Sequence, residues 1–202
     1  MSNEAEEAFK LGKQEFRSGN VHEALQLWYH ASELGNPDAM YELGRIAYEV
    51  GELEDASSFW RMAAEKGVSA AMHEMAKLAA EFGDEVEERK WSEAAANAGD
   101  PSAMYNLGVM FEQDLNLSEA KKWYLLAADL GHSSAMHNLG VMAYQTANLA
   151  EAKKWYLLSA EAGDTDAMIN LGLMAHHAGD LSEAKKWFKL ARPNTNTFEV
   201  RD

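Results

Sequence analysis

The chain has 202 residues, no cysteine and a formal net charge of −15. This length allows one sizeable domain or a short repeat array, and the lack of cysteine excludes a disulfide framework and cysteine-based metal or nucleophile sites. Residues 1–100 carry −12 of the charge. Such a field repels phosphate backbones, so we expect no nucleic-acid partner.

The opening stretch, MSNEAEEAFKLGKQEF, is acidic and lacks the apolar segment of a signal peptide. No apolar run in the chain approaches the roughly 20 residues that a membrane span needs. The sequence therefore predicts a cytoplasmic protein without a membrane partner.

The chain repeats itself every 32 residues. The dipeptide Ala-Met occurs at 39, 71, 103, 135 and 167, and one step further back lies Glu7-Ala8 followed by FKLG. A fixed period in this range is typical of a stacked solenoid. The sequence thus predicts six units, which start near 7, 39, 71, 103, 135 and 167.

Each unit contains two short amphipathic patterns, which in the second unit cover 39–50 and 53–67. Their apolar residues recur at helical spacing, which predicts two helices per unit. Polar residues stand where N-caps are expected, and glycines where helices end. The expected N-caps of first helices are Asp38, Ser102, Ser134 and Asp166. The expected capping boxes of second helices are Asn20/Glu23, Asn116/Glu119, Asn148/Glu151 and Asp180/Glu183. The expected closing glycines are Gly35, Gly67, Gly99, Gly131 and Gly163.

Small and aromatic residues recur in fixed columns, which predicts close helix packing. A glycine inside a helix costs about 1 kcal/mol relative to alanine, so its recurrence indicates a compensating close approach. The glycine column is Gly12, Gly44, Gly108, Gly140 and Gly172, and the alanine column is Ala24, Ala56, Ala120, Ala152 and Ala184. We expect Trp91, Trp123, Trp155 and Trp187 to fill the space between units.

The pattern A-M-x-N-L-G-x-M followed by E-A-x-x-W-Y-x-x-A-A-x-x-G resembles the Sel-one-like repeat, a relative of the tetratricopeptide repeat. The resemblance extends over about residues 7–192. It implies an all-α fold, a right-handed α-solenoid of six 32-residue helix-turn-helix repeats, and it implies scaffold or adaptor work rather than catalysis. Only about two residues separate the helices here, fewer than is usual in that family, so we expect geometry close to that of tetratricopeptide repeats.

The third unit departs from the columns. Ala76 replaces the glycine, Glu85 an apolar residue, Glu88 the small alanine and Ser92 an aromatic residue. A buried carboxylate is costly, so one interpretation is a looser joint at 83–92. The other is that local rotation carries these side chains to solvent.

The residues left over after packing lie on one face of each first helix. The resemblance places this face in the concave groove of the array. In units 1–3 it carries mixed charge, whereas in units 4–6 it carries an asparagine column beside an apolar strip. Such asparagines could bind an extended peptide backbone, or could instead satisfy neighbouring backbone groups. The candidate partner-binding residues are Tyr105, Asn106, Val109, Gln113, His137, Asn138, Val141, Tyr144, Asn170, Leu173 and His177.

Two patterns resemble chemical sites without their companions. Ser118 and Lys121 match S-x-x-K, as do Ser182 and Lys185, but no K-T-G or S-D-N accompanies them. The histidines lack the spacing of a metal site. The sequence therefore predicts no enzyme, no catalytic residue, no cofactor and no metal.

The C-terminal end of the array has no further amphipathic helix to cover it. We expect one repeat domain over 1–192 and a tail over 193–202, in which Phe198 and Val200 are the only apolar anchors. An uncovered solenoid end favours tail docking or self-association. The sequence thus predicts an adaptor that binds a protein or peptide in the groove of units 4–6. The alternative is an acidic regulator that binds a basic surface on a partner enzyme or nucleic-acid-binding protein.

Overall fold

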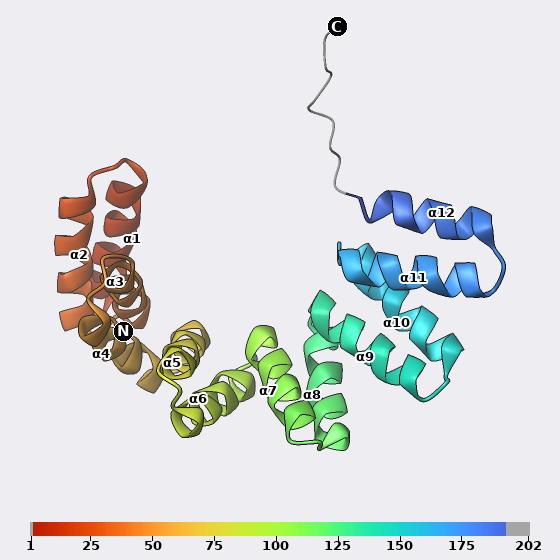
Figure 1. Cartoon of the computed structure of the whole chain (residues 1–202). Helices are drawn as coiled ribbons and strands as arrows, with labels where there is room; N and C mark the ends of the chain where they lie inside the picture. Colours follow the sequence, from red (N-terminus) through yellow and green to blue (C-terminus); the bar gives the residue numbers. More distant parts are fainter. Residues whose placement is uncertain (1, 193–202) are drawn as a thin grey trace, which may run out of the picture. The chain divides into compact units, whose positions relative to one another are not determined.

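The computed structural model describes residues 2–192, which form twelve α-helices and no strand (Figure 1). The helices are α1 (Asn3–Arg17), α2 (Val21–Glu33), α3 (Pro37–Glu49), α4 (Leu53–Glu65), α5 (Ser69–Glu81), α6 (Glu85–Asn97), α7 (Pro101–Gln113), α8 (Leu117–Asp129), α9 (Ser133–Gln145), α10 (Leu149–Glu161), α11 (Thr165–His177) and α12 (Leu181–Leu190). The all-α repeat fold is therefore confirmed, with two helices in each of six repeats.

Within a repeat the two helices pack against each other, as α1 does on α2 and α9 on α10. Neighbouring repeats are joined by packing of a second helix on the next first helix, as α4 does on α5 and α10 on α11. The chain divides into two compact units, Met1–Ala103 and Met104–Asp202. The single domain over 1–192 stays a prediction.

The N-caps predicted for the first helices are wrong by two residues, because these helices begin earlier than the apolar pattern indicates. The capping acceptors are Asn36, Asp100, His132 and Asp164, which accept the N–H groups of Ala39, Ala103, Ala135 and Ala167 at 2.9, 2.8, 3.3 and 2.8 Å. Pro37 and Pro101 favour this start, since proline suits the first helical position. The predicted caps Asp38, Ser102, Ser134 and Asp166 instead lie in the first turn of each helix.

The capping boxes predicted for the second helices are only half formed. Side-chain oxygens of Asn116, Asn148 and Asp180 accept the N–H groups three residues later, at 3.4, 3.3 and 2.9 Å. The N–H groups of these cap residues do not turn to a glutamate but donate to carbonyls of the preceding helix. At Asn20 the prediction is wrong, because its side chain donates to Glu15 and makes no cap bond.

The five closing glycines have φ between +87° and +92°, so they do end the second helices in the left-handed region. The turn between the two helices of a repeat also needs a positive φ. Gly19, Gly51, Gly83 and Gly179 supply it in four repeats, whereas Leu115 and Ala147 adopt φ of 59° and 58° in repeats 4 and 5.

The glycine column does permit a close approach between the two helices of a repeat. A methyl group on any of these glycines would lie closer than 3.0 Å to an aromatic ring of the second helix. The rings belong to Trp28, Trp60, Tyr124, Tyr156 and Phe188. The first four of these are at most 3% exposed.

Of the tryptophans predicted to fill the space between repeats, Trp91 and Trp187 do pack against cores that span neighbouring repeats. Trp91, Trp123, Trp155 and Trp187 are only half-buried. They lie one position before the deeply buried column, which faces the glycines. The alanine column is confirmed as core, with every member at most 3% exposed.

The third repeat has substitutions on both sides of this contact. Ala76 stands in the glycine column and Ser92 in the aromatic column, and both are buried. A small side chain on one helix thus leaves room for the extra methyl group on the other. Glu85 is exposed and Glu88 is half-buried, while a looser joint at 83–92 stays a prediction.

The last described helix, α12, leaves apolar side chains open. Leu181 and Leu190 are 65% and 55% exposed, and Trp187 and Phe188 are half-buried. Phe198 and Val200, the anchors expected for tail docking, lie outside the described residues.

Candidate functional site

The predicted partner-binding residues lie on α7, α9 and α11, the first helices of repeats 4–6. Half-buried members are Tyr105, Asn106, Val109, His137, Asn138, Val141 and Asn170, and exposed members are Gln113, Tyr144, Leu173 and His177. Side-chain contacts of His137, Asn138 and Asn170 join consecutive repeats. Of the eleven residues of this surface, His137 and Asn170 contact each other directly, whereas Asn138 contacts Tyr124 of α8.

His137 occupies the centre of this surface. Its Nδ1 lies 3.3 Å from Asp164 Oδ1, and its Nε2 lies 3.5 Å from the Asn170 side-chain nitrogen. A neutral ring that donates from Nδ1 to the carboxylate leaves Nε2 as an acceptor for the Asn170 amide, which satisfies both contacts. Asp164 also caps α11 by accepting the Ala167 N–H. The His137 position is thereby coupled to the start of the next repeat.

Tyr124 links α8 to this surface. Its hydroxyl donates to Glu112 Oε2 at 2.7 Å, and Asn138 also hydrogen-bonds the phenol. Burial, and then the hydrogen bond to Glu112, raise the pKa of Tyr124 well above its ordinary value of 10.0, while the contact with Asn138 opposes the rise. The phenol is thus a fixed, neutral part of the site.

Asn138 and Asn170 contact side chains of neighbouring helices, a role that neither sequence interpretation included. Asn138 contacts the Tyr124 phenol, and Asn170 contacts the His137 ring. Each asparagine side chain can make about four hydrogen bonds, two as donor and two as acceptor. One contact apiece leaves capacity for an additional ligand.

Apolar exposure on this surface is concentrated in repeat 6. Val109 and Val141 are half-buried, and Val141 packs against the core around Tyr156. Ile169 and Leu173 are 38% and 44% exposed. The strip predicted over three repeats is therefore open mainly on α11.

The sequence analysis did not identify two N-cap residues, His132 and Asp164, as neighbours of the candidate site residues Tyr105 and His137. The Tyr105 ring stacks on His132, with centroids 4.7 Å apart and planes at 16°, and His137 contacts Asp164. Both cap residues lie 27 positions after their partners. The signal is a polar residue directly after four of the five closing glycines, and Val68 after the remaining glycine is the exception.

The corresponding face of repeats 2 and 3 is internally paired. Lys77 Nζ lies 2.7 Å from Glu74, and this hydrogen bond raises the pKa of Lys77. Arg45 contacts Glu42 and Glu49, and the Tyr48 hydroxyl donates to Glu81 at 2.7 Å. A ligand there would have to compete with these partners.

The serines and lysines of the S-x-x-K patterns lie in environments typical of ordinary surface residues. Ser118 and Ser182 are exposed at the starts of α8 and α12, and Lys121 lies 3.5 Å from Glu151 of the next repeat. Among residues 2–192 no group of three histidine or acidic side chains is arranged to hold a metal ion. None of the described helices combines the length and the hydropathy that a membrane span requires.

Comparison with protein families finds two repeat models. The Sel1 repeat matches residues 37–68, 101–132 and 165–192, and the tetratricopeptide repeat matches residues 133–161. The curated proteins include no significant match.

Several solved structures are similar to this chain. A Sel1 repeat protein from Oxalobacter formigenes is 24% identical with a TM-score of 0.78, over 94% of this chain and 88% of its own. The protective antigen c5321 of uropathogenic Escherichia coli, which has an SLR fold, is 24% identical with a TM-score of 0.79, over 91% and 44%. The Pseudomonas aeruginosa protein pilF is 17% identical with a TM-score of 0.69, over 91% and 88%. At these identities the likeness concerns the fold alone.

Proposed function

We propose that the chain is a non-catalytic adaptor, because three of its segments match the Sel1 repeat and a fourth matches the tetratricopeptide repeat. Proteins of this repeat family generally act as protein–protein interaction scaffolds. The adaptor binds a peptide or protein segment along the first helices of repeats 4–6, the face that lines the concave groove in tetratricopeptide-like arrays. The supporting observation is the asparagine column with remaining hydrogen-bonding capacity beside exposed Ile169 and Leu173.

The chemistry of this face suits an extended segment. Asparagine amides supply donors and acceptors to a peptide backbone without selecting its side chains. Exposed apolar groups rimmed by polar residues supply contact area for one or two side chains. Repeats 2 and 3 suit such a ligand less well, since their charges are already paired.

The test is a triple substitution, Asn106→Ala with Asn138→Ala and Asn170→Ala. A partner is first identified by a pull-down from native lysate, and its affinity for the purified chain is then measured. We expect binding to weaken at least tenfold, with the helical content unchanged by circular dichroism. Asn97→Ala, at an exposed position on α6, is the matched control. Unchanged affinity in the triple variant would contradict the groove assignment.

The second candidate is an acidic regulator that binds a basic surface on an enzyme or nucleic-acid-binding protein. The observation that favours it is the −12 charge of residues 1–100. Exposed charges are screened by salt, so this function requires binding that weakens strongly as salt rises. Salt-insensitive binding supports the adaptor. Self-association through the C-terminal end and a cytoplasmic location both stay predictions.

A further inference from the structure

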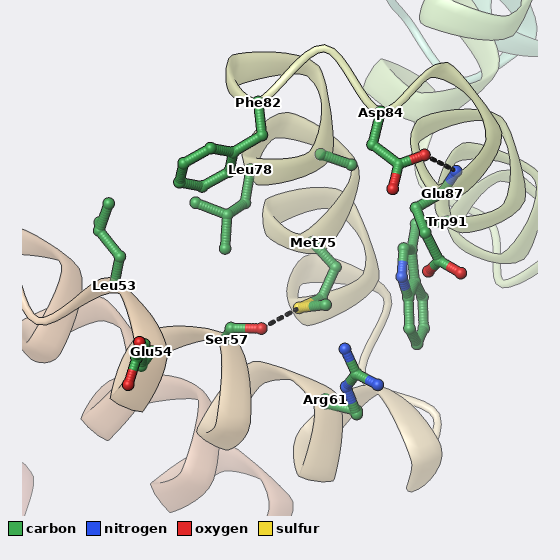
Figure 2. A pocket seen from close by; sticks show the side chains of 11 residues that line it. Leu53, Glu54, Ser57, Arg61, Met75, Leu78, Phe82, Asp84, Glu87 and Trp91 are labelled. Carbon is green, nitrogen blue, oxygen red and sulfur yellow. Dashed lines mark hydrogen bonds between the residues drawn. The ribbon is translucent and has the colours of Figure 1, made fainter.

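A hollow of about 460 Å³ lies between α4, α5 and α6 (Figure 2). Its apolar lining comes from Leu53 of α4, Met75, Leu78 and Phe82 of α5, and Trp91 of α6. Glu74 and Lys77 of α5, which belong to the paired face described above, are not among its lining residues. The hollow lies wholly within the unit Met1–Ala103, whereas the proposed adaptor site lies in the other unit.

Two residues at this joint differ from their counterparts in repeat 1. At the joint between repeats 1 and 2, Leu25 packs on the core, and the Tyr29 ring meets Phe59 edge-on with centroids 5.8 Å apart. The positions one repeat later are Ser57 and Arg61, opposite Trp91. A hydroxyl group and an exposed guanidinium thus replace the isobutyl group and the aromatic ring.

The position of Arg61 is apolar in repeats 1, 4 and 5, whereas repeat 3 has Glu93 there. Repeats 4 and 5 have Leu125 and Leu157 there, and Leu157 packs on the core together with Trp187. The Ser57 hydroxyl meets only the Met75 sulfur, at 3.9 Å. Arg61 makes no hydrogen bond or ion pair within residues 2–192. The joint of repeats 2 and 3 therefore keeps an unfilled apolar space, whereas the joints of repeats 1 and 2 and of repeats 5 and 6 are packed at these positions.

The charged residues around the hollow indicate which kind of partner segment would bind there. Its lining includes three carboxylates, Glu54, Asp84 and Glu87, against the single cation Arg61. Glu87 is paired with Lys90 at 2.7 Å, and Asp84 caps α6, whereas Glu54 has no partner among the described residues. Residues 1–100 as a whole add a field of −12. Large apolar side chains next to lysine or arginine fit both the lining and the charge.

We propose that this hollow is a second docking site, which takes two apolar side chains of a partner segment flanked by basic residues. Its volume is within the range of small-ligand pockets, and an amphipathic helix that places apolar residues one turn apart would fill it. This site is independent of the groove and lets one chain hold two segments at once.

The test uses three synthetic peptides and the full chain, with affinities from isothermal titration calorimetry. The probe has two leucines one helical turn apart, flanked by lysines. One comparison peptide replaces the lysines with glutamates, and the other replaces the leucines with serines. We expect the probe to bind at least tenfold more tightly than either comparison peptide.

Two filling variants decide the location. Ser57→Leu with Arg61→Tyr restores the packing of the preceding joint, and Ala79→Leu fills the hollow from α5. Each should weaken the probe at least tenfold with circular dichroism and thermal unfolding unchanged. The first variant also makes the chain one charge more negative, so attraction by net charge alone predicts tighter binding. If the first variant unfolds, Ala79→Leu alone decides.

Carboxylate variants decide the chemistry. Glu54→Gln with Glu87→Gln should weaken the probe, whereas the control Glu7→Gln with Glu33→Gln, equal in charge change but on α1 and α2, should not. The triple asparagine variant of the groove should bind the probe with unchanged affinity, which separates this proposal from the adaptor site. Failure of both filling variants to weaken the probe, or tighter binding of the glutamate peptide, would overturn the proposal.

Discussion

Gly140 and Tyr156 offer a direct test of the packing that holds each repeat together. A methyl group added to Gly140 would lie 2.6 Å from two carbons of the Tyr156 ring, which is itself 3% exposed. Real contacts of this kind are longer, so the ring or the helix must shift. The third repeat already carries the accommodated version of this contact, Ala76 with Ser92.

The expected magnitude follows from two opposing effects. Overpacking a well-filled core costs about 2 kcal/mol, and replacing a helical glycine with alanine returns about 1 kcal/mol. Gly140→Ala should therefore lower the free energy of unfolding by about 1 kcal/mol. Tyr156→Ser alone should cost about 3–5 kcal/mol, as for other large aromatic truncations in a core. In the Tyr156→Ser background the clash is gone, so Gly140→Ala should instead stabilise by about 1 kcal/mol.

The assay is urea unfolding of the four proteins, followed by circular dichroism. The data are fitted with a nearest-neighbour model, because a repeat array need not unfold in one step. The decisive quantity is the sign of the Gly140→Ala effect in the two backgrounds. If Gly140→Ala stabilises the parent and the Tyr156→Ser variant equally, close packing against the aromatic ring is not the reason for the recurring glycines, and the reasoning is refuted.

Two further predictions concern the neighbourhood of the site. Asp164→Ala removes the N-cap of α11 and should lower the free energy of unfolding, measured by thermal unfolding, by about 1 kcal/mol. Asp166→Ala should lower it by only a few tenths of that, since Asp166 interacts only with the helix dipole. Equal losses of stability in the two variants would contradict the observed start of α11. The raised pKa of Tyr124 means that this phenol should stay protonated at about pH 11, above the usual tyrosine value near 10. Its stabilising effect should be present below the ordinary pKa and lost as pH rises through the raised one. An ultraviolet titration of tyrosine ionisation checks this, and Tyr124→Phe should remove a late-titrating component that is present in the parent.

The sequence predicted the repeat, its period and its helix pairs because these depend on local periodicity. Apolar spacing, closing glycines and second-helix caps act within a few residues of one another, so they can be recognised without coordinates. The glycine column was also interpretable, because its cost in a helix demands a packing reason.

Other features were set by contacts that the repeat pattern does not specify. Both Trp155 and Tyr156 suit a buried aromatic position, and only the rotation of α10 against α9 places Tyr156 over Gly140. Asp164 and Asp166 are equally good caps by residue type, and the hydrogen bond to Ala167 selects the first.

The chain's own sequence therefore determines a stack of six helix pairs and shows which columns vary from repeat to repeat. The tertiary structure decides which of those residues have spare hydrogen-bonding capacity, since Asn138 and Asn170 already contact Tyr124 and His137. It also decides that the joint at Ser57 and Arg61 stays hollow. A missing side chain leaves a space only where no neighbour from another helix moves in to fill it, and that depends on three helices at once.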